Sequence, residues 1–426
     1  MNKIEILGAK ETLYKEHLDN GLDIYMVPNY NVKNFYITLN VKYGSIYNKF
    51  KYKGKNYDMP KGIAHYLEHL MFNMPEGSAF EYFSKLGSPV NAFTSFDITC
   101  YEVFSNSKFK ENLSYLVKYV YTPYFTKEMV NNERGIITEE VKMYDDMPAT
   151  SLYYDSLSSV FVNDERKYLI SGTVDDIKKI TLDDIKTIYE AFYHPENMFL
   201  VITGNFNPEE AIAIVSETMA DMNFDEYEKP ILKSINEPFK VNREYSKITT
   251  NIDKSKIAIS LKFPINNFKS LKLTNIELKL YFNLIMLLLF GNTSILKEEL
   301  TSNGILTEDI SFSLINTDEY FVETIMASTD YPEYFLKRVM ETLDNIIIKE
   351  EDVERKKKMC ISNLIMMFDE IEIVNGEIQK DLIDYDEFLN DMYGIYRSLN
   401  IETVKEVAEK MKKKIYSVNI LIPEDN

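Results

Sequence analysis

The hydrophobic pattern along the 426-residue chain predicts an α+β protein whose order of elements begins again halfway. Stretches rich in β-branched and aromatic residues, typical of strands, occur in the first half at 22–27, 35–41, 98–104 and 199–203. In the second half, a strand at 257–263 is followed by an apolar helix at 278–290 and another helix at 294–300. The repeated order indicates an internal duplication. Residues 224–241 have two prolines and no regular period, which is typical of a connection between domains.

One predicted helix, residues 62–72 (GIAHYLEHLMF), combines apolar positions all round with three polar side chains. A helix that is hydrophobic on every side is buried. At 100° per residue, His65, Glu68 and His69 fall on one face. Burying an ionised glutamate beside two histidines is unfavourable unless something pairs with them.

A divalent metal ion resolves this problem, because imidazoles at positions i and i+4 of a helix reach one Zn²⁺. Glu68, one turn away, can then take a proton from the attacking water. The alternative is a core helix with satisfied histidines and a carboxylate that reaches the surface. We favour the metal, since the chain has only four histidines and a chance His-x-x-Glu-His pattern is rare.

Catalytic zinc needs a third protein ligand. His17 and His194 precede a glycine turn and a proline, so we expect surface or loop roles for them. A carboxylate is the alternative. The predicted helix 126–146, with Thr126 as N-cap and Pro148 ending it, carries Glu133 and Glu140 on one face. We expect that face to point inward, with Glu139 in solvent, because it also carries Ile136, Ile137, Val141 and Tyr144.

Composition narrows the class of protein. The length fits two domains of about 200 residues each, and the net charge of −19 argues against nucleic acid or an anionic membrane as a partner. The acidic excess would attract cationic peptides, although solubility explains it more simply. With only Cys100 and Cys360, no secretory signal and no apolar run of about 20 residues, we expect a cytoplasmic protein.

The histidines and glutamates of these two helices make the chain resemble the insulinase, or pitrilysin, family (M16). Members of this family are inverted zincins with a His-x-x-Glu-His motif and a downstream glutamate. The resemblance implies that His65, His69 and Glu140, 71 residues after His69, bind Zn²⁺ and that Glu68 is the general base. It also implies that Glu133 supports a motif histidine. A strand beginning Asn-Ala would pair with a peptide substrate, here through Asn91, Ala92, Phe93 and Thr94; these residues could instead merely shape the start of a strand.

The family fold implies two similar insulinase-type domains, each a mostly antiparallel sheet flanked by helices, with substrate enclosed between four such domains. We place these domains at residues 1–225 and 242–426, with a linker at 226–241. The function implied is that of a zinc metalloendopeptidase acting on peptides or small polypeptides.

The chain departs from active family members in its second half. Those members carry an Arg and a Tyr that bind the substrate carbonyl, and the corresponding residues 291–313 contain neither. The chain therefore resembles the bacterial zinc-carrying subunit of paired two-domain M16 peptidases. The resemblance implies a heterodimer with a zinc-less subunit that supplies Arg and Tyr, while a homodimer stays open. The alternative is a non-catalytic, peptide-binding or architectural subunit.

Overall fold

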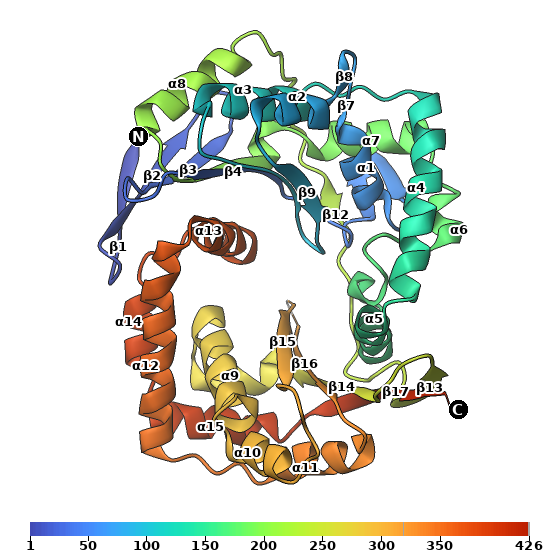
Figure 1. Ribbon diagram of the computed structural model, residues 1–426, viewed down its shortest axis with the longest axis vertical. Helices are drawn as coiled ribbons and strands as arrows, with labels where there is room; N and C mark the ends of the chain where they lie inside the picture. Colours follow the sequence, from blue (N-terminus) through green and yellow to red (C-terminus); the bar gives the residue numbers. More distant parts are fainter. Residues whose placement is uncertain (318, 425–426) are drawn as a thin grey trace. The chain divides into compact units, whose positions relative to one another are not determined.

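The computed structural model describes residues 1–317 and 319–424, which form two compact units (Figure 1). Unit 1 contains Met1–Lys142, Leu169–Ser234 and Leu364–Met392. Unit 2 contains Met143–Tyr168, Ile235–Asn363 and the residues from Tyr393 onward. Each unit is therefore built mainly from one half of the chain and includes a segment from the other half. Segment 364–392, from the second half, belongs to unit 1, and segment 143–168, from the first half, belongs to unit 2.

Unit 1 is an α+β unit with a seven-stranded sheet in the order β1-β2-β3-β11-β4-β10-β9. Its sheet strands are β1 (Asn2–Ile6), β2 (Glu11–His17), β3 (Asp23–Pro28), β4 (Phe35–Val41), β9 (Val90–Thr94), β10 (Thr99–Ser105) and β11 (Met198–Gly204). Smaller strands are β5 (Lys49–Tyr52), β6 (Lys55–Asp58), β7 (Asn73–Met74), β8 (Gly77–Ser78) and β12 (Ile231–Leu232). The helices are α1 (Ile63–Met71), α2 (Ala79–Leu86), α3 (Phe109–Val120), α4 (Lys127–Asp145), α6 (Val174–Ile177), α7 (Leu182–Phe192), α8 (Pro208–Met219) and α13 (Ile371–Tyr385).

The two faces of this sheet are covered by different helices. On one face, Leu39 and Tyr101 belong to the main core, which includes residues of α1, α3, α7 and α8. On the other, α13 packs on β4 and β11 (Figure 1). Asn375 of α13 accepts a hydrogen bond from the Thr38 hydroxyl at 2.7 Å and donates one to the Val201 carbonyl at 3.2 Å. These contacts fix a helix from the second half of the sequence on the sheet of the first half.

Unit 2 has a five-stranded sheet in the order β13-β17-β14-β16-β15. Its strands are β13 (Tyr245–Thr250), β14 (Lys256–Pro264), β15 (Ser311–Asn316), β16 (Tyr320–Ser328) and β17 (Ile415–Pro423). The helices are α5 (Pro148–Val160), α9 (Asn275–Phe290), α10 (Ile295–Ser302), α11 (Pro332–Asp344), α12 (Glu350–Met366), α14 (Met392–Ser398) and α15 (Ile401–Met411). The last residues of α12 and the first of α14 belong to unit 1, and the residues of α4 from Met143 onward belong to unit 2.

The two sheets repeat one topology. Strands β3-β11-β4-β10-β9 of unit 1 correspond in order to β13-β17-β14-β16-β15 of unit 2. In both, the first pair is parallel and the other pairs are antiparallel. The exchanged helices also correspond, since α5 packs on β14 and β17 as α13 packs on β4 and β11. The prediction of an α+β fold with two similar, mostly antiparallel domains is confirmed.

Helix α9 is the most apolar helix of unit 2. The segment 275–302, which contains α9 and α10, is long and apolar enough to span a membrane by length and composition, and 61% of its most apolar window is buried inside the structure. Phe282 of α9 contacts the rings of Phe263 on β14 and Phe321 on β16. Packing against this sheet accounts for the hydrophobicity of α9.

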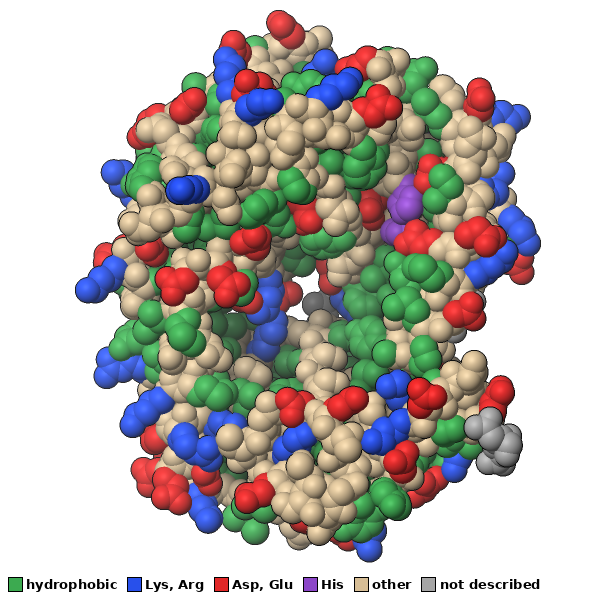
Figure 2. All heavy atoms as spheres, in the orientation of Figure 1, with side chains coloured by type: hydrophobic (Ala, Val, Ile, Leu, Met, Phe, Trp, Pro, Cys, Tyr) green, Lys and Arg blue, Asp and Glu red, His purple; other side chains and the backbone are tan. Residues whose placement is uncertain are grey.

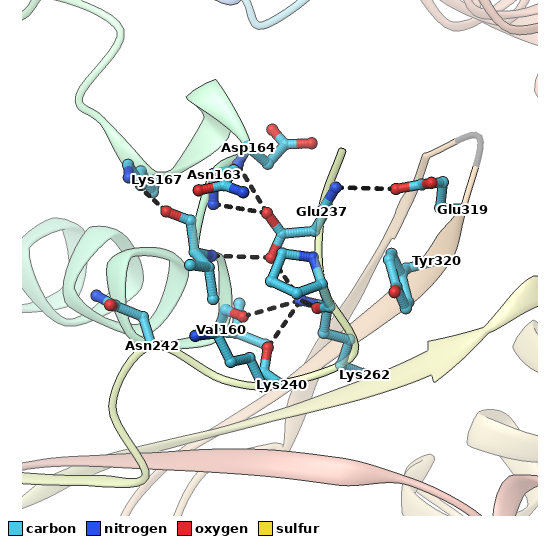
Figure 3. A network of polar contacts seen from close by, with 12 residues as sticks. Val160, Asn163, Asp164, Lys167, Glu237, Lys240, Asn242, Lys262, Glu319 and Tyr320 are labelled. Carbon is cyan, nitrogen blue, oxygen red and sulfur yellow. Dashed lines mark hydrogen bonds and ion pairs between the residues drawn. The ribbon is translucent and has the colours of Figure 1, made fainter. Parts of the chain in front are cut away.

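A buried ion pair fixes the connecting segment near residue 237 within unit 2 (Figure 3). The Lys262 side chain, fully buried on β14, donates to Glu237 at 2.5 Å and to the carbonyls of Pro238 and Lys240, both at 3.0 Å. Glu237 in turn accepts hydrogen bonds from the backbone N–H groups of residues 162, 163 and 164. The pair therefore joins β14 to the loop that follows α5.

Replacing Lys262 by methionine is expected to lower the free energy of unfolding by about 3–5 kcal/mol, because Glu237 would be left as a buried charge without its cation. Urea denaturation of the wild type and the variant measures this loss. The matched control is Lys178→Met, which removes an exposed partner of Asp175 and should change stability by at most about 1 kcal/mol. Equal losses in the two variants would show that the Lys262 pair contributes no more than a surface pair.

Candidate metal centre

Helix α1 places two histidines and a glutamate beside one another in unit 1. The helix begins after Gly62, whose φ of 81° favours glycine and whose Cβ, if present, would lie 2.1 Å from the Ser171 carbonyl oxygen. Apolar residues around α1 are buried in the main core, as predicted. His65 and Glu68 are buried, and the rings of His65 and His69 are 4.6 Å apart.

Helix α4 brings two carboxylates to these imidazoles. The Thr126 hydroxyl accepts a hydrogen bond from the Met129 N–H at 3.2 Å, so Thr126 caps this helix as expected. Glu133 Oε1 lies 2.9 Å from His69 Nδ1. The two oxygens of Glu140 lie 3.5 Å from His65 Nε2 and 3.4 Å from His69 Nε2. One ligand atom from each of His65, His69 and Glu140 lies within 4.8 Å of the others.

These distances fit three ligands of one ion better than hydrogen bonds. Separations of 3.4 and 3.5 Å are longer than ordinary N–H···O bonds. Two ligands of a tetrahedral zinc ion, each bound at about 2.0–2.1 Å, lie roughly 3.3 Å apart. In the neutral ring whose Nδ1–H donates to Glu133, the Nε2 atom of His69 has the lone pair that a metal ion requires. Two imidazoles and one carboxylate form a donor set typical of catalytic zinc.

The cluster is partly open to solvent. The side chains of His65, Glu140 and His69 are 11%, 22% and 24% exposed. Figure 2 shows histidine side chains at the surface between α1 and α4, next to acidic and hydrophobic side chains. A catalytic zinc ion needs such an opening, because its fourth position must admit water or substrate.

The pKa values of the two imidazoles are shifted in opposite directions. Burial lowers the pKa of His65 to about 4, and repulsion by His69 adds to this effect. Burial opposes protonation of His69 as well, but its hydrogen bond to Glu133 and the charge of Glu68 outweigh burial and raise its pKa. His65 is therefore neutral at physiological pH, the state in which imidazole binds a metal.

Glu68 is held in place from a neighbouring strand. The Thr94 hydroxyl, at the end of β9, donates to Glu68 Oε2 at 2.6 Å. Burial raises the pKa of Glu68 to about 7, and the Thr94 hydrogen bond opposes part of this rise. A carboxylate with a pKa near neutrality can both accept and release a proton.

The other predicted residues occupy several environments. Asn91, Ala92, Phe93 and Thr94 lie on β9, which is one edge of the sheet and pairs only with β10 among the described strands. The His17 side chain is 67% exposed and His194 accepts a hydrogen bond in a loop, so neither joins the cluster. Glu139 is 74% exposed, as expected.

The prediction for one residue of α4 was wrong. Ile136 was expected to face inward but is 58% exposed, whereas Ile137 and Val141 are buried. The core face of α4 is centred on Ile137 and Val141, about 100° or more around the helix from Ile136. The sequence also did not reveal that Thr94 bonds to Glu68, because the signal is a tertiary contact between residues 26 apart.

Comparisons with known proteins identify the family of this chain. Residues 26–171 match a family model described as "Insulinase (Peptidase family M16)", and residues 179–360 match one described as "Peptidase M16 inactive domain". The chain is 33% identical over 411 residues to "Uncharacterized zinc protease YmfH" of Bacillus subtilis (strain 168), covering 96% of this chain and 95% of that protein. It is 30% identical over 217 residues to "Zinc protease PqqE" of Helicobacter pylori, covering 49% and 47%.

Two solved structures share the fold. A structure described as an M16-like peptidase from Alicyclobacillus acidocaldarius matches with a TM-score of 0.89 at 24% identity, covering 97% of this chain and 99% of that one. A protease from Helicobacter pylori matches with a TM-score of 0.81 at 21% identity, covering 96% and 99%. At these identities the structures support the fold alone.

Proposed function

Because the chain belongs to the insulinase family of peptidases, M16, we propose that it is a zinc metallopeptidase whose metal is held by His65, His69 and Glu140. The observation that carries this proposal is the convergence of one ligand atom from each of these residues within 4.8 Å. The names of the relatives, zinc proteases, support the choice of metal.

The residues of this chain divide the chemistry between them. Bound zinc supplies a Lewis acid that polarises the scissile carbonyl and lowers the pKa of water. Glu68 accepts the proton of the attacking water on its carboxylate and delivers it to the leaving amine. Thr94 holds Glu68 Oε2, so one carboxylate oxygen is oriented while the other is left for proton transfer. Glu133 orients His69 through Nδ1.

We further propose that strand β9 binds the peptide. It is a sheet edge, and an added strand would be held by main-chain hydrogen bonds to residues 91–94. Main-chain pairing gives affinity for extended peptides with little dependence on their sequence. The substrate is accordingly a peptide or small polypeptide that can adopt an extended conformation.

A partner subunit completes the proposed enzyme. Residues 291–313 contain neither Arg nor Tyr, and residues 179–360 match the M16 inactive domain. Without these donors the oxyanion would lose stabilisation, and one donor is worth roughly 2.7–4 kcal/mol. We propose a heterodimer with a zinc-less relative that carries the Arg and Tyr.

Mixing the purified chain with such a relative is expected to raise peptide hydrolysis by about 100-fold or more, since each missing donor accounts for roughly 10²–10³ in kcat. Hydrolysis of a quenched fluorescent peptide measures the rate of each chain alone and of the mixture. Full activity of this chain alone, with no gain on mixing, would contradict the need for a partner while leaving the metal site intact.

A further inference from the structure

One face of the unit 1 sheet carries an acidic side chain next to the proposed peptide-binding strand. In the strand register, Glu102 of β10 lies directly opposite Thr38 of β4 and Asn91 of β9. Because Thr38 bonds to Asn375 of α13, Glu102 points to the face of the sheet on which α13 packs. Helix α13 packs on β4 and β11, whereas Asn91 at the β9 edge is exposed. Glu102 therefore lies between the covered strands and the free edge.

The half-buried Glu102 carboxylate is fixed in place without a cation. The Tyr36 hydroxyl donates a hydrogen bond to its Oε2 atom, and among the described residues nothing bonds to Oε1. Burial raises the pKa of Tyr36, and the bond to Glu102 and the charge of Glu372 add to this rise, so the hydroxyl keeps its proton. Charges on antiparallel sheets gain stability from opposite charges directly across, but both residues across from Glu102 are uncharged. The carboxylate therefore has an open position for a cation.

Strand β9 presents its side chains alternately to the two faces of the sheet. Thr94 lies on the side of α1, because it bonds to Glu68. Asn91 and Phe93 point to the opposite face, that of Glu102, since successive side chains alternate along a strand. A peptide that pairs with β9 alternates in the same way. Its side chains on the Glu102 side are therefore not those that point to the metal centre.

The distance between such a peptide and Glu102 favours a long side chain. Neighbouring strands lie about 4.8 Å apart, so the peptide backbone would lie about 9–10 Å from the backbone of β10. Asn91 stands between them with a short, uncharged side chain. Lysine and arginine carry their charge at the end of a long stem and can cross β9, and the Phe93 ring, 40% exposed, offers the stem an apolar surface. An acidic side chain there would be repelled by Glu102 and Glu372.

We propose that Glu102 selects peptides that carry a lysine or arginine on the α13 side of the strand paired to β9. This inference rests on the proposed peptidase function and adds to it a preference that does not involve the zinc ligands. Glu102 binds the cation of the peptide, and Tyr36 positions the carboxylate. Main-chain pairing to β9 would supply affinity for any extended peptide, and Glu102 would distinguish basic peptides from neutral and acidic ones.

The test compares quenched fluorescent peptides that differ only in Arg, Gln or Glu at one position, with that position moved along the peptide. We expect one position at which Arg raises kcat/KM about 10-fold over Gln, the scale of one charge-assisted hydrogen bond in a partly open site. Glu102→Gln keeps the size of the side chain and its bond from Tyr36, and should lower this ratio to nearly 1. Glu102→Lys should reverse the order, so that the Glu peptide is preferred over the Arg peptide, a result that misfolding does not produce.

The matched control is Glu5→Gln, because Glu5 lies on β1, at the other edge of the same sheet; it should keep the wild-type ratio. Binding of the peptides to zinc-loaded Glu68→Gln protein, measured by fluorescence anisotropy, should show the same order without turnover. An Arg preference that survives in the Glu102→Gln protein would overturn the inference. So would zinc-loaded, active wild type with no Arg preference at any position. Wild type that binds the Arg peptide preferentially but holds no zinc would contradict the proposed function and leave Glu102 as a binding residue.

Discussion

Glu68→Gln protein is expected to retain zinc and to hydrolyse peptides about 10²–10⁴-fold more slowly than the wild type, the range attributed to a general acid–base group. Glutamine keeps the size of the side chain and can still accept the Thr94 hydrogen bond, but it cannot accept and release a proton at neutral pH. The zinc-to-protein ratio and kcat for one peptide, measured under the conditions in which the wild type is active, check both parts.

A control separates the loss of the base from a change in charge. Glu139→Gln removes one negative charge from the same region, but its side chain is exposed and paired with Lys142. It should leave kcat within about twofold of the wild type, since surface pairs contribute little. Turnover by the Glu68→Gln protein at the wild-type rate would remove Glu68 from the mechanism.

His65→Ala protein is expected to lose both zinc and activity. The remaining His69 and Glu140 supply two ligands where a catalytic zinc ion takes three. Mutation of a residue that only supports a ligand reduces affinity by about 10–100-fold, so loss of a ligand should weaken binding by more than 100-fold. Competition with a fluorescent zinc chelator measures the affinity.

His17→Ala is the matched control for that substitution, since His17 is 67% exposed and pairs with Asp23 away from the cluster. It should bind zinc as the wild type does. If His65→Ala protein held one zinc ion with wild-type affinity, the metal would have to be bound elsewhere on the chain.

The convergence of His65, His69 and Glu140 was predictable in part from local spacing, because two histidines and a glutamate share one face of an apolar helix. Spacing also made Glu133 and Glu140 candidates, since they lie seven apart on another helix, but the choice of Glu140 as third ligand came from the family resemblance. The helical period wrongly placed Ile136 in the core, because an apolar residue at the margin of a helix face can lie in the core or in solvent. The bond between Thr94 and Glu68 depends on how β9 lies against α1, and no local pattern specifies that packing.

The repeated order of elements was also visible in the sequence, but the exchange of helices between the units was not. The apolar positions of α13, such as Val374 and Ile378, show that one face is buried without identifying the sheet that covers it. Its buried Asn375 bonds to Thr38, 337 residues away. Contacts over such separations are set by the tertiary fold rather than by propensity.

The most direct test of the proposed zinc site is anomalous scattering at the zinc absorption edge from a crystal of the wild-type protein. We expect one strong peak in unit 1, about 2.0–2.2 Å from His65 Nε2, His69 Nε2 and a carboxylate oxygen of Glu140. A zinc-loaded protein whose peak lies elsewhere, or in which Glu140 stays beyond bonding distance of the ion, would contradict the proposed ligand set.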